Sequence, residues 1–249
     1  MLYLLSQFET PVHMKNLKFL LSLFLIGLLS CQEVAEDPNT LSKREQKEGW
    51  TLLFDGKSLD QWRSYLKDDI SGWIVEDGTM KALGLGGDEG GDIITRKQFE
   101  NFELSLEWKI GDAGNSGILY MVKEDTGFHQ VYWTGPEYQL IDEIGFPQEL
   151  QDWQMTGANY AMHPAQNPEV KPAGEWNTSK IVKSGADVQH WLNGKKVVEY
   201  QLWTEDWEAK VSDGKWSTFP NYGRFKKGHI SLQDHGSLAW FRNIKIREL

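Results

Sequence analysis

The stretch that decides the fold is Phe102–Ile110, which reads Phe-Glu-Leu-Ser-Leu-Glu-Trp-Lys-Ile. Apolar side chains stand at every second position, with two glutamates, a serine and a lysine between them. Because successive side chains of a strand point to opposite faces of a sheet, this pattern predicts one face in the core and one in polar surroundings. We therefore expect a strand in a two-sided sheet.

Short β-rich runs recur along the rest of the chain, and turn residues close many of them. Asp55-Gly56, Asp77-Gly78 and Asn193-Gly194 are strong turn signals, because such pairs adopt the backbone angles of tight hairpins. Thr204–Val211 is the run with helical character, and we expect it to lie in a loop. Further strands are expected at Trp50–Phe54, Trp73–Glu76, Ile118–Lys123, Val131–Thr134, Tyr138–Ile141, Lys180–Lys183, Val188–Leu192, Val197–Gln201, His229–Leu232 and Leu238–Ile246.

This number of strands, with almost no helical periodicity, predicts an all-β domain, a sandwich of two antiparallel sheets or a jelly roll. The sequence contains no evident repeat or second domain. Its 249 residues, of which 40% are hydrophobic and 25% charged, are typical of a globular protein and exclude a disordered chain. A formal net charge of −10, without a long run of Lys or Arg, argues against nucleic acid as a partner.

The N-terminal region has the features of an export signal. Phe19–Leu29 is apolar except for a serine and a glycine, and its 11 residues are too few to span a membrane. It ends in Leu28-Leu29-Ser30-Cys31, which resembles the lipobox of bacterial lipoproteins. We therefore predict a lipid on Cys31; the alternative is a secreted protein with an incidental cysteine.

The same reasoning predicts the domain boundaries. Residues 1–30 are expected to be the signal peptide, with Met14 a better start than Met1 because lysines follow it. Residues 31–48 are polar and are expected to form the lipidated N-terminus and a tether. Residues 49–249 are expected to form the folded domain.

Polar side chains on three predicted strands are candidates for a binding groove. Glu137 and Gln139 share one side of a strand, two residues or about 6.5 Å apart, a spacing that suits sugar hydroxyls or a metal ion. Gln233 and His235 share a side near the end of another strand, and Glu107 lies on the polar face of the strand quoted first. These side chains line a groove if the three sides coincide; otherwise they keep an exposed sheet soluble.

Other candidates each have a structural alternative. Asp142 follows the strand of Glu137, and His190 lies on a hairpin arm, where it either binds substrate or belongs to the core. Asn115-Ser116-Gly117 has the composition of a turn that opens a strand. Gly117 would let another part of the chain approach closely, so this turn could also shape the floor of a groove.

The chain has 12 Trp residues, an unusual supply of large flat rings. Trp108 and Trp240 lie on apolar faces and are expected in the core. An acidic, aromatic-rich sandwich with a polar groove suggests a carbohydrate ligand. We find no Cys and His cluster with zinc spacing and no phosphate-binding glycine loop. The candidates for rings that stack on sugars are Trp133, Trp203, Trp207 and Trp216.

Several motifs together resemble a known family. They are Trp50–Trp62, Asn101–Leu104, Glu107-Trp108, Asn115–Ile118, Glu137–Asp142, Gly174–Asn177, His190–Gly194, Gly228–Gly236 and Phe241–Ile244. In this order, and over essentially all of Gly49–Leu249, the chain resembles the 3-keto-disaccharide hydrolase family. One departure bears on substrate binding: similar members often place an arginine after the Asn-Ser-Gly strand, whereas this chain has Met121, with Lys123 nearby.

The resemblance implies a concanavalin-like jelly roll, often lipid-anchored in the cell envelope of Gram-negative bacteria, facing the periplasm or the outside. It implies action on glycosides oxidised at C3. A ketone at C3 acidifies the C2 proton, so a base can remove it, the C1 substituent leaves, and water adds to the enone, giving net hydrolysis.

On this basis we expect His235, Glu137 and Asp142 to be catalytic. A divalent cation is a candidate cofactor, because it would stabilise the enolate. The alternatives are a non-catalytic glycan-binding module, or a conventional glycosidase that uses Glu107 and Glu137 as its carboxylate pair. The residues expected to contact the substrate are Gln139, Gln233, Glu107, Asn115, Lys123, Trp133 and His190.

Overall fold

The structure, a computed structural model, describes residues 37–87 and 90–249. The predicted signal peptide, the start at Met14 and the lipidated Cys31 lie outside the described residues. Among the residues that are described, no helix has the length and apolar character needed to cross a membrane.

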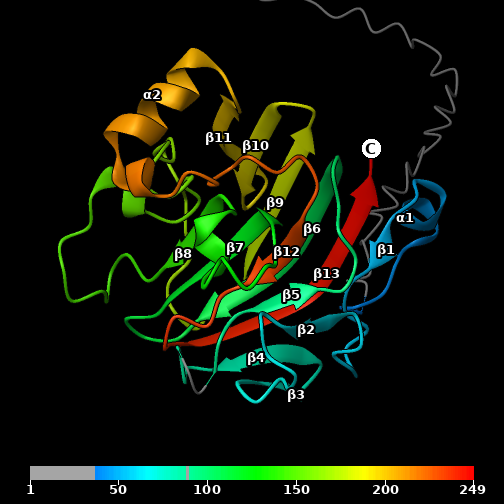
Figure 1. The fold of residues 1–249 in the computed structure, drawn as a ribbon. Coiled ribbons are helices and arrows are strands. Elements are labelled where there is room, and N and C mark those ends of the chain that lie inside the picture. Colours follow the sequence, from blue (N-terminus) through cyan, green and yellow to red (C-terminus); the bar gives the residue numbers. More distant parts are fainter. Residues whose placement is uncertain (1–36, 88–89) are drawn as a thin grey trace, which may run out of the picture. The chain divides into compact units, whose positions relative to one another are not determined.

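Two antiparallel sheets make up the domain, as the strand pattern predicts (Figure 1). The smaller sheet has the order β2 (Trp62–Ser64), β5 (Ile93–Thr95), β12 (His229–Leu232), β7 (Asn115–Val122) and β8 (Glu137–Ile141). The larger sheet has the order β11 (Lys195–Gln201), β10 (Asp187–Leu192), β9 (Asn177–Ser184), β6 (Phe102–Ile110), β13 (Leu238–Glu248), β4 (Thr79–Leu83) and β3 (Trp73–Glu76), and β1 (Thr51–Leu52) also pairs with β13. The jelly-roll sandwich is confirmed.

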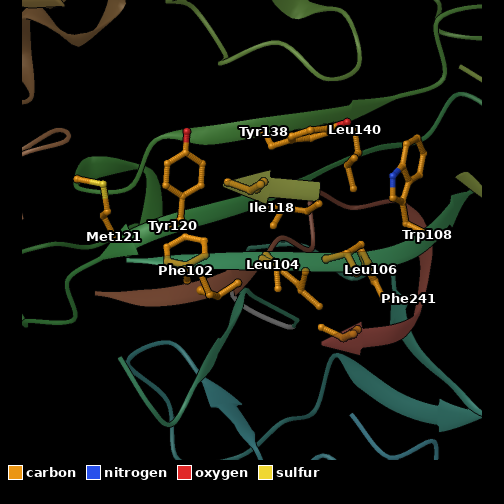
Figure 2. Close-up of a cluster of buried hydrophobic side chains, with 14 of the residues drawn as sticks. Phe102, Leu104, Leu106, Trp108, Ile118, Tyr120, Met121, Tyr138, Leu140 and Phe241 are labelled. Atoms are coloured by element: carbon orange, nitrogen blue, oxygen red, sulfur yellow. The ribbon is translucent and has the colours of Figure 1, made fainter. Parts of the chain in front are cut away.

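The core lies between the two sheets and follows the alternation of the opening stretch. In β6 the apolar residues are buried and the polar residues between them are half-buried. Figure 2 shows Phe102, Leu104 and Leu106 of β6 beside Tyr120 of β7 and Leu140 of β8. At about 25 cal/mol per Å² of apolar surface, burial of such side chains is the main stabilising contribution to the sandwich.

The strand prediction is wrong at one place and incomplete at others. The run Val131–Thr134 is expected to be a strand, but Val131–Trp133 forms a 3-10 helix, η1. The carbonyl of Val131 accepts the backbone N–H of Gly135 at 3.0 Å, which closes a turn instead of extending a strand. The short strands β2, β4 and β5 are not among the predicted runs.

The helical run is longer and more regular than expected. Helix α2 (Glu205–Asp213) begins after Thr204, whose hydroxyl accepts the backbone N–H of Trp207, and this N-cap satisfies one otherwise unpaired donor. Trp207 is fully buried, so packing holds the helix on the domain. Two further 3-10 helices, η2 (Asp152–Gln154) and η3 (Lys215–Thr218), lie in the connections.

The segment expected to be a tether packs on the domain from Asn39 onwards. The Asn39 side chain donates to the carbonyl of Gly78 at 2.9 Å and accepts the backbone N–H of Asn243 at 2.8 Å. Helix α1 (Lys43–Lys47) follows, and its Glu45 forms an ion pair with Lys245 of β13. Folded structure therefore begins about ten residues earlier than the composition suggests, and polar contacts that composition does not reveal hold it there.

Candidate functional site

A polar pocket of about 190 Å³ lies on the outer face of the smaller sheet. On β8, Tyr138 and Leu140 point into the core, so Glu137 and Gln139 point to the other face. Segments around the 3-10 helices cover this face, since η1, η3 and the chain after η2 all contribute to the pocket wall. The lining residues are Asn115, Tyr132, Glu137, Gln139, Tyr160, Lys215, Gln233 and His235.

Glu137 is the carboxylate that lines this pocket, and only 6% of the residue is exposed. Burial raises the pKa of its carboxyl group to about 8, although the nearby positive charge of Lys215 acts in the opposite sense. In the described part of the chain, no side chain donates a hydrogen bond to this carboxyl group. A carboxyl group that titrates near neutral pH and has a free oxygen can take up a proton from a ligand.

Gly117 on the neighbouring strand β7 makes room for Glu137. A Cβ atom at Gly117 would lie 2.4 Å from Oε1 of Glu137 and 3.0 Å from its Cγ and Cδ. The expected close approach at Gly117 is therefore an approach of the Glu137 side chain itself, across the β7–β8 pair.

Lys215 brings a positive charge to the pocket, and no carboxylate in the described part of the chain forms an ion pair with it. Its ammonium nitrogen lies over the rings of Tyr160 at 4.3 Å, Trp216 at 4.9 Å and Tyr132 at 5.9 Å. These distances place it within the range of cation–π attraction. Partial burial lowers the pKa of Lys215, while Glu137 acts to raise it. The three rings hold the ammonium group and leave its N–H donors available to a ligand.

Two amide side chains supply acceptors to the same pocket. Oε1 of Gln233 and Oδ1 of Asn115 are buried and have no hydrogen-bond partner in the described part of the chain. The backbone holds Gln233 in place, because its carbonyl accepts the Ser116 hydroxyl at 2.8 Å and its N–H donates to Gly117 at 3.0 Å. Buried acceptors without a partner are costly, so these two oxygens indicate a ligand with hydroxyl donors.

His235 lies at the end of this wall and is exposed to solvent. The structure thus brings together Asn115, Glu137, Gln139, Gln233 and His235, all five from the sequence prediction. Their catalytic or binding roles stay predictions, but their convergence in one pocket is what those roles require.

Asp142 lies outside the pocket lining, and its carboxylate holds a loop. Its two oxygens accept the backbone N–H groups of Ala113 at 2.8 Å, Ile144 at 3.2 Å and Gly145 at 3.0 Å. With both oxygens engaged in this way, the geometry gives Asp142 a structural position instead of the expected catalytic one.

Glu107 also lies elsewhere, on the outer face of the larger sheet. Its carboxylate forms an ion pair with Arg242 at 2.7 Å and accepts the Asn243 amide at 3.1 Å. Because Glu107 and Glu137 occupy the outward faces of two different sheets, the core separates them. They cannot flank one glycosidic bond, so the geometry does not support this pair as the carboxylates of a conventional glycosidase.

Lys123 and Trp133 are not among the residues that line the pocket, and they lie in two different places. Lys123 is half-buried beyond the end of β7, and Met121 before it points into the core (Figure 2). Trp133 lines a separate apolar hollow with Phe128 and Phe219. The expected contacts of Lys123 and Trp133 with a ligand in the pocket are therefore not supported by their positions.

The remaining tryptophans also differ from expectation. Trp207 and Trp216 are fully buried and stack on Tyr222, so they are core rings, and only Trp216 reaches the site through Lys215. Trp203 is half-buried and its indole donates to the Gly223 carbonyl. Trp240, expected in the core, is half-buried and lies beside Lys109 on the outer face of the larger sheet.

His190 belongs to the core. Its Nδ1 donates to the Gly157 carbonyl at 2.9 Å, so Nε2 accepts the Tyr120 hydroxyl, also at 2.9 Å. Burial lowers the pKa of His190 to about 3, and the ring stays neutral in the folded protein near neutral pH. The structural alternative for His190 thus agrees with its position.

This burial predicts an acid-dependent loss of stability. Because the unfolded histidine takes up a proton near its ordinary pKa of 6.5 and the folded one does not, His190 favours unfolding as the pH falls below 6.5. We expect wild type to lose up to about 1.4 kcal/mol of unfolding free energy per pH unit from this group. Urea titrations between pH 7 and pH 5 should show a shallower dependence in His190→Asn, and an unchanged slope would contradict the assignment.

Sequence reasoning missed Tyr132, Tyr160 and Lys215. All three lie in irregular connections and come to the site from segments far apart in the chain. The one local signal is that Lys215 directly precedes Trp216, one of the tryptophans that the sequence offers as rings to stack on sugars.

A jelly-roll sandwich whose pocket combines amide oxygens, a carboxyl group and aromatic rings defines a class of proteins that recognise carbohydrates. The family model described as 3-keto-alpha-glucoside-1,2-lyase-like domain matches residues 49–247, so the chain belongs to this family. The predicted family is therefore confirmed.

Known relatives agree with the family. A 3-keto-disaccharide hydrolase of Bacteroides thetaiotaomicron is 36% identical, with 86% of this chain and 83% of the relative covered. A crystal structure from Parabacteroides distasonis, provisionally described as a glycosyl hydrolase, is 43% identical with a TM-score of 0.82, covering 86% of this chain and 100% of the other. A second such structure from the same organism is 31% identical with a TM-score of 0.62, covering 80% and 99%.

Proposed function

We propose that this protein cleaves the glycosidic bond of 3-keto-glycosides, with Glu137 as the base that removes the C2 proton. The family and the named activity of the Bacteroides relative support this substrate class. The observation that carries the proposal is the buried carboxyl group of Glu137, which titrates near pH 8 in a pocket that also holds the ammonium of Lys215.

The chemistry runs in two steps. The Glu137 carboxylate takes the proton from C2, the C1–O bond breaks, and the bonding electrons leave with the oxygen of the second group. Water then adds to the enone, with its hydroxyl on C1 and a proton returned to C2. The sum is hydrolysis, and no oxidant or reductant is needed.

Five side chains of the pocket have roles in this scheme. A raised pKa makes Glu137 a stronger base than an ordinary carboxylate. The Lys215 ammonium stabilises the negative charge that develops on the C3 oxygen, and its partial burial strengthens this interaction. His235 gives a proton to the leaving oxygen, while Gln233 and Asn115 accept hydrogen bonds from sugar hydroxyls.

The candidate metal cofactor is not needed for these roles. Among the described residues, no group of three or more His, Cys, Asp or Glu side chains is arranged to hold a metal ion. The pocket offers one carboxylate and one imidazole, which are too few ligands for a site made by protein side chains alone. Positive charge comes from Lys215 instead.

The test compares a purified 3-keto-disaccharide with its unoxidised parent on the purified protein. We expect release of free sugar from the 3-keto compound and none from the parent. Release from the parent would favour a conventional glycosidase. Binding of the parent without turnover of either compound would favour a glycan-binding module and would contradict the proposal.

A substitution at Gly117 tests the position of the base. In Gly117→Ala the new methyl group would displace the Glu137 carboxyl group, and a shift of about 1 Å costs on the order of 10²-fold in rate. We expect this loss in kcat, with the unfolding temperature measured in parallel. Gly111→Ala is the matched control, because its Cβ would meet only ordinary contacts at 3.4 Å and beyond. Full activity of Gly117→Ala would argue against Glu137 as the base.

We also propose that a lipid on Cys31 anchors the protein in the cell envelope of a Gram-negative bacterium. The support is the sequence around Cys31. Wild type should partition into the detergent phase of a cell extract, and Cys31→Ser should remain in the aqueous phase. Equal partitioning of the two would contradict the anchor.

A further inference from the structure

The outer face of the larger sheet carries tryptophans and lysines side by side. Trp240 of β13 pairs in register with Lys81 of β4 on one side and with Lys109 of β6 on the other. Further along the sheet, Lys180 of β9 and Trp191 of β10 are also direct neighbours. The residues before and after each of these five are buried, so the five side chains point away from the core.

The lysines of this surface lie over the tryptophan rings. Nζ of Lys109 is 4.8 Å from the ring centroid of Trp240 and 5.3 Å from that of Trp176, which directly precedes β9. Nζ of Lys81 is 5.6 Å from Trp240, and the distance from Lys180 to Trp191 is 4.4 Å. All four distances are within the range of cation–π attraction. We call this surface the Trp–Lys face, and its residues are Lys81, Lys109, Trp176, Lys180, Trp191 and Trp240.

Two ammonium groups of the Trp–Lys face keep their full positive charge. Glu76 pairs with Lys81, and Glu107 pairs with an arginine of β13. Lys109 and Lys180 form no ion pair with any carboxylate of residues 37–87 and 90–249. A ring attracts an ammonium group without cancelling its charge, so these two lysines can still bind an anion. On a chain with a formal net charge of −10, such a local excess of positive charge favours an anionic ligand.

The three tryptophans set a second requirement for the ligand. Trp176, Trp191 and Trp240 are half-buried, so part of each indole is open to solvent. An accessible indole packs well on the apolar C–H face of a sugar ring, and an ammonium group beside it can bind a carboxylate on that sugar. A neutral glycan would leave the two free charges unused, and a small anion would leave the rings unused. A polymer of acidic sugars uses both.

We propose that the Trp–Lys face binds an acidic polysaccharide, whose carboxylates contact Lys109 and Lys180 while its sugar rings pack on the three tryptophans. The pocket around Glu137 lies on the outer face of the other sheet, so the core separates the two sites. The polysaccharide is therefore a second ligand and not the substrate of the proposed reaction, and the inference does not rest on the proposed function.

An anionic membrane is the competing partner for a surface of tryptophans and lysines. Binding of a protein surface to a membrane requires apolar side chains that enter the boundary between headgroups and acyl chains. The tryptophans of the Trp–Lys face are half-buried between lysines and project little beyond them. This arrangement suits a ligand that lies along the sheet better than a bilayer that must be entered.

Binding is measured by affinity electrophoresis and calorimetry with polygalacturonate, and with its fully methyl-esterified form as the neutral counterpart. The two polymers have the same sugar rings and differ in the charge of the carboxyl groups. We expect wild type to bind polygalacturonate at least tenfold more tightly than the ester. Added salt should reduce this preference, because it screens interactions between exposed charges.

Variants locate the binding on the Trp–Lys face. Lys109→Gln combined with Lys180→Gln should weaken binding of polygalacturonate about tenfold, since exposed ion pairs contribute modestly and distant ones add. Trp176→Ala should weaken binding of both polymers about fivefold, because stacking does not depend on the carboxylate. Lys210→Gln, which removes a lysine paired with Asp206 on α2, is the matched control and should bind like wild type. Turnover of a 3-keto-disaccharide and the unfolding temperature should stay unchanged in all these variants.

Several results would overturn the assignment. They are no binding of polygalacturonate by wild type, equal binding of the two polymers, and wild-type affinity in the double lysine variant. Binding to vesicles of phosphatidylglycerol and phosphatidylcholine, without binding to polygalacturonate, would assign the face to a membrane and would also overturn it. Failure of the proposed function is a different result, because turnover of the 3-keto-disaccharide by wild type tests that function separately.

Discussion

Glu137→Gln is expected to lower kcat for a 3-keto-disaccharide by about 10²–10⁴-fold, the usual contribution of a general base. Glutamine keeps the size and polarity of the side chain but cannot take up the C2 proton. Because burial places the pKa of Glu137 at about 8, kcat/KM of wild type should rise with pH and level off above that value. Initial rates from pH 5 to pH 9 measure both effects, and the residual activity of Glu137→Gln should lack this rising limb.

Glu137→Gln should also change how the free energy of unfolding depends on pH. This measurement distinguishes a variant that has lost only the catalytic base from one that is misfolded. The folded protein holds a proton on Glu137 between the ordinary pKa of 4.5 and about 8, whereas the unfolded chain has released it. Stability therefore falls as the pH rises through this window, by up to about 1.4 kcal/mol per unit. Asp92, whose pKa burial raises to about 7, contributes in the same direction.

Glu137→Gln should retain its fold and show a shallower loss of stability between pH 4.5 and pH 8. Glu103→Gln is the matched control, because Glu103 lies on the outer face of β6 and pairs with Arg247 of β13. We expect Glu103→Gln to keep full turnover. A Glu137→Gln protein that is folded and fully active would contradict the proposed mechanism.

The fold was largely predictable from the sequence because period-two alternation reports directly on which side chains enter a core. Phe102–Ile110 has the strict alternation that its burial follows. Val131–Thr134 lacks it: four mostly apolar residues fit a strand and a buried turn equally well, and the pattern of the chain cannot distinguish them. The strands β2 and β5 have three residues each, too few for an alternation to be recognised.

The site was predictable where strands, or the residues that directly follow them, build it. Glu137, Gln139 and Gln233 were found because their neighbours in the strands are core residues. Alternation also placed Glu107 on a polar face, but it does not say to which of two outward faces that side chain belongs. The pairing of strands far apart in the chain decides this, and it puts β6 and β8 in different sheets.

The connections contribute the part of the site that no local pattern reveals. Tyr132, Tyr160 and Lys215 have no periodic context, and their meeting depends on how η1, η2 and η3 pack over the smaller sheet. His190 illustrates the opposite case, since a polar residue on a strand face became a core residue through two buried hydrogen bonds. Prediction of such residues requires tertiary contacts.

Lys215→Met is expected to lower kcat for a 3-keto-disaccharide by about 10²–10³-fold, the usual cost of removing one group that stabilises a developing negative charge. Methionine keeps an unbranched apolar stem against the rings of Tyr160 and Trp216 but lacks the charge. Since Lys215 lowers the pKa of Glu137, the variant should also move the rising limb of its pH profile to higher pH. A merely structural lysine would not produce this shift. Lys210→Met, which removes a half-buried lysine paired with Asp206 on α2, is the control and should leave both kcat and the profile unchanged. An unshifted profile with full turnover in Lys215→Met would exclude the ammonium group from the reaction.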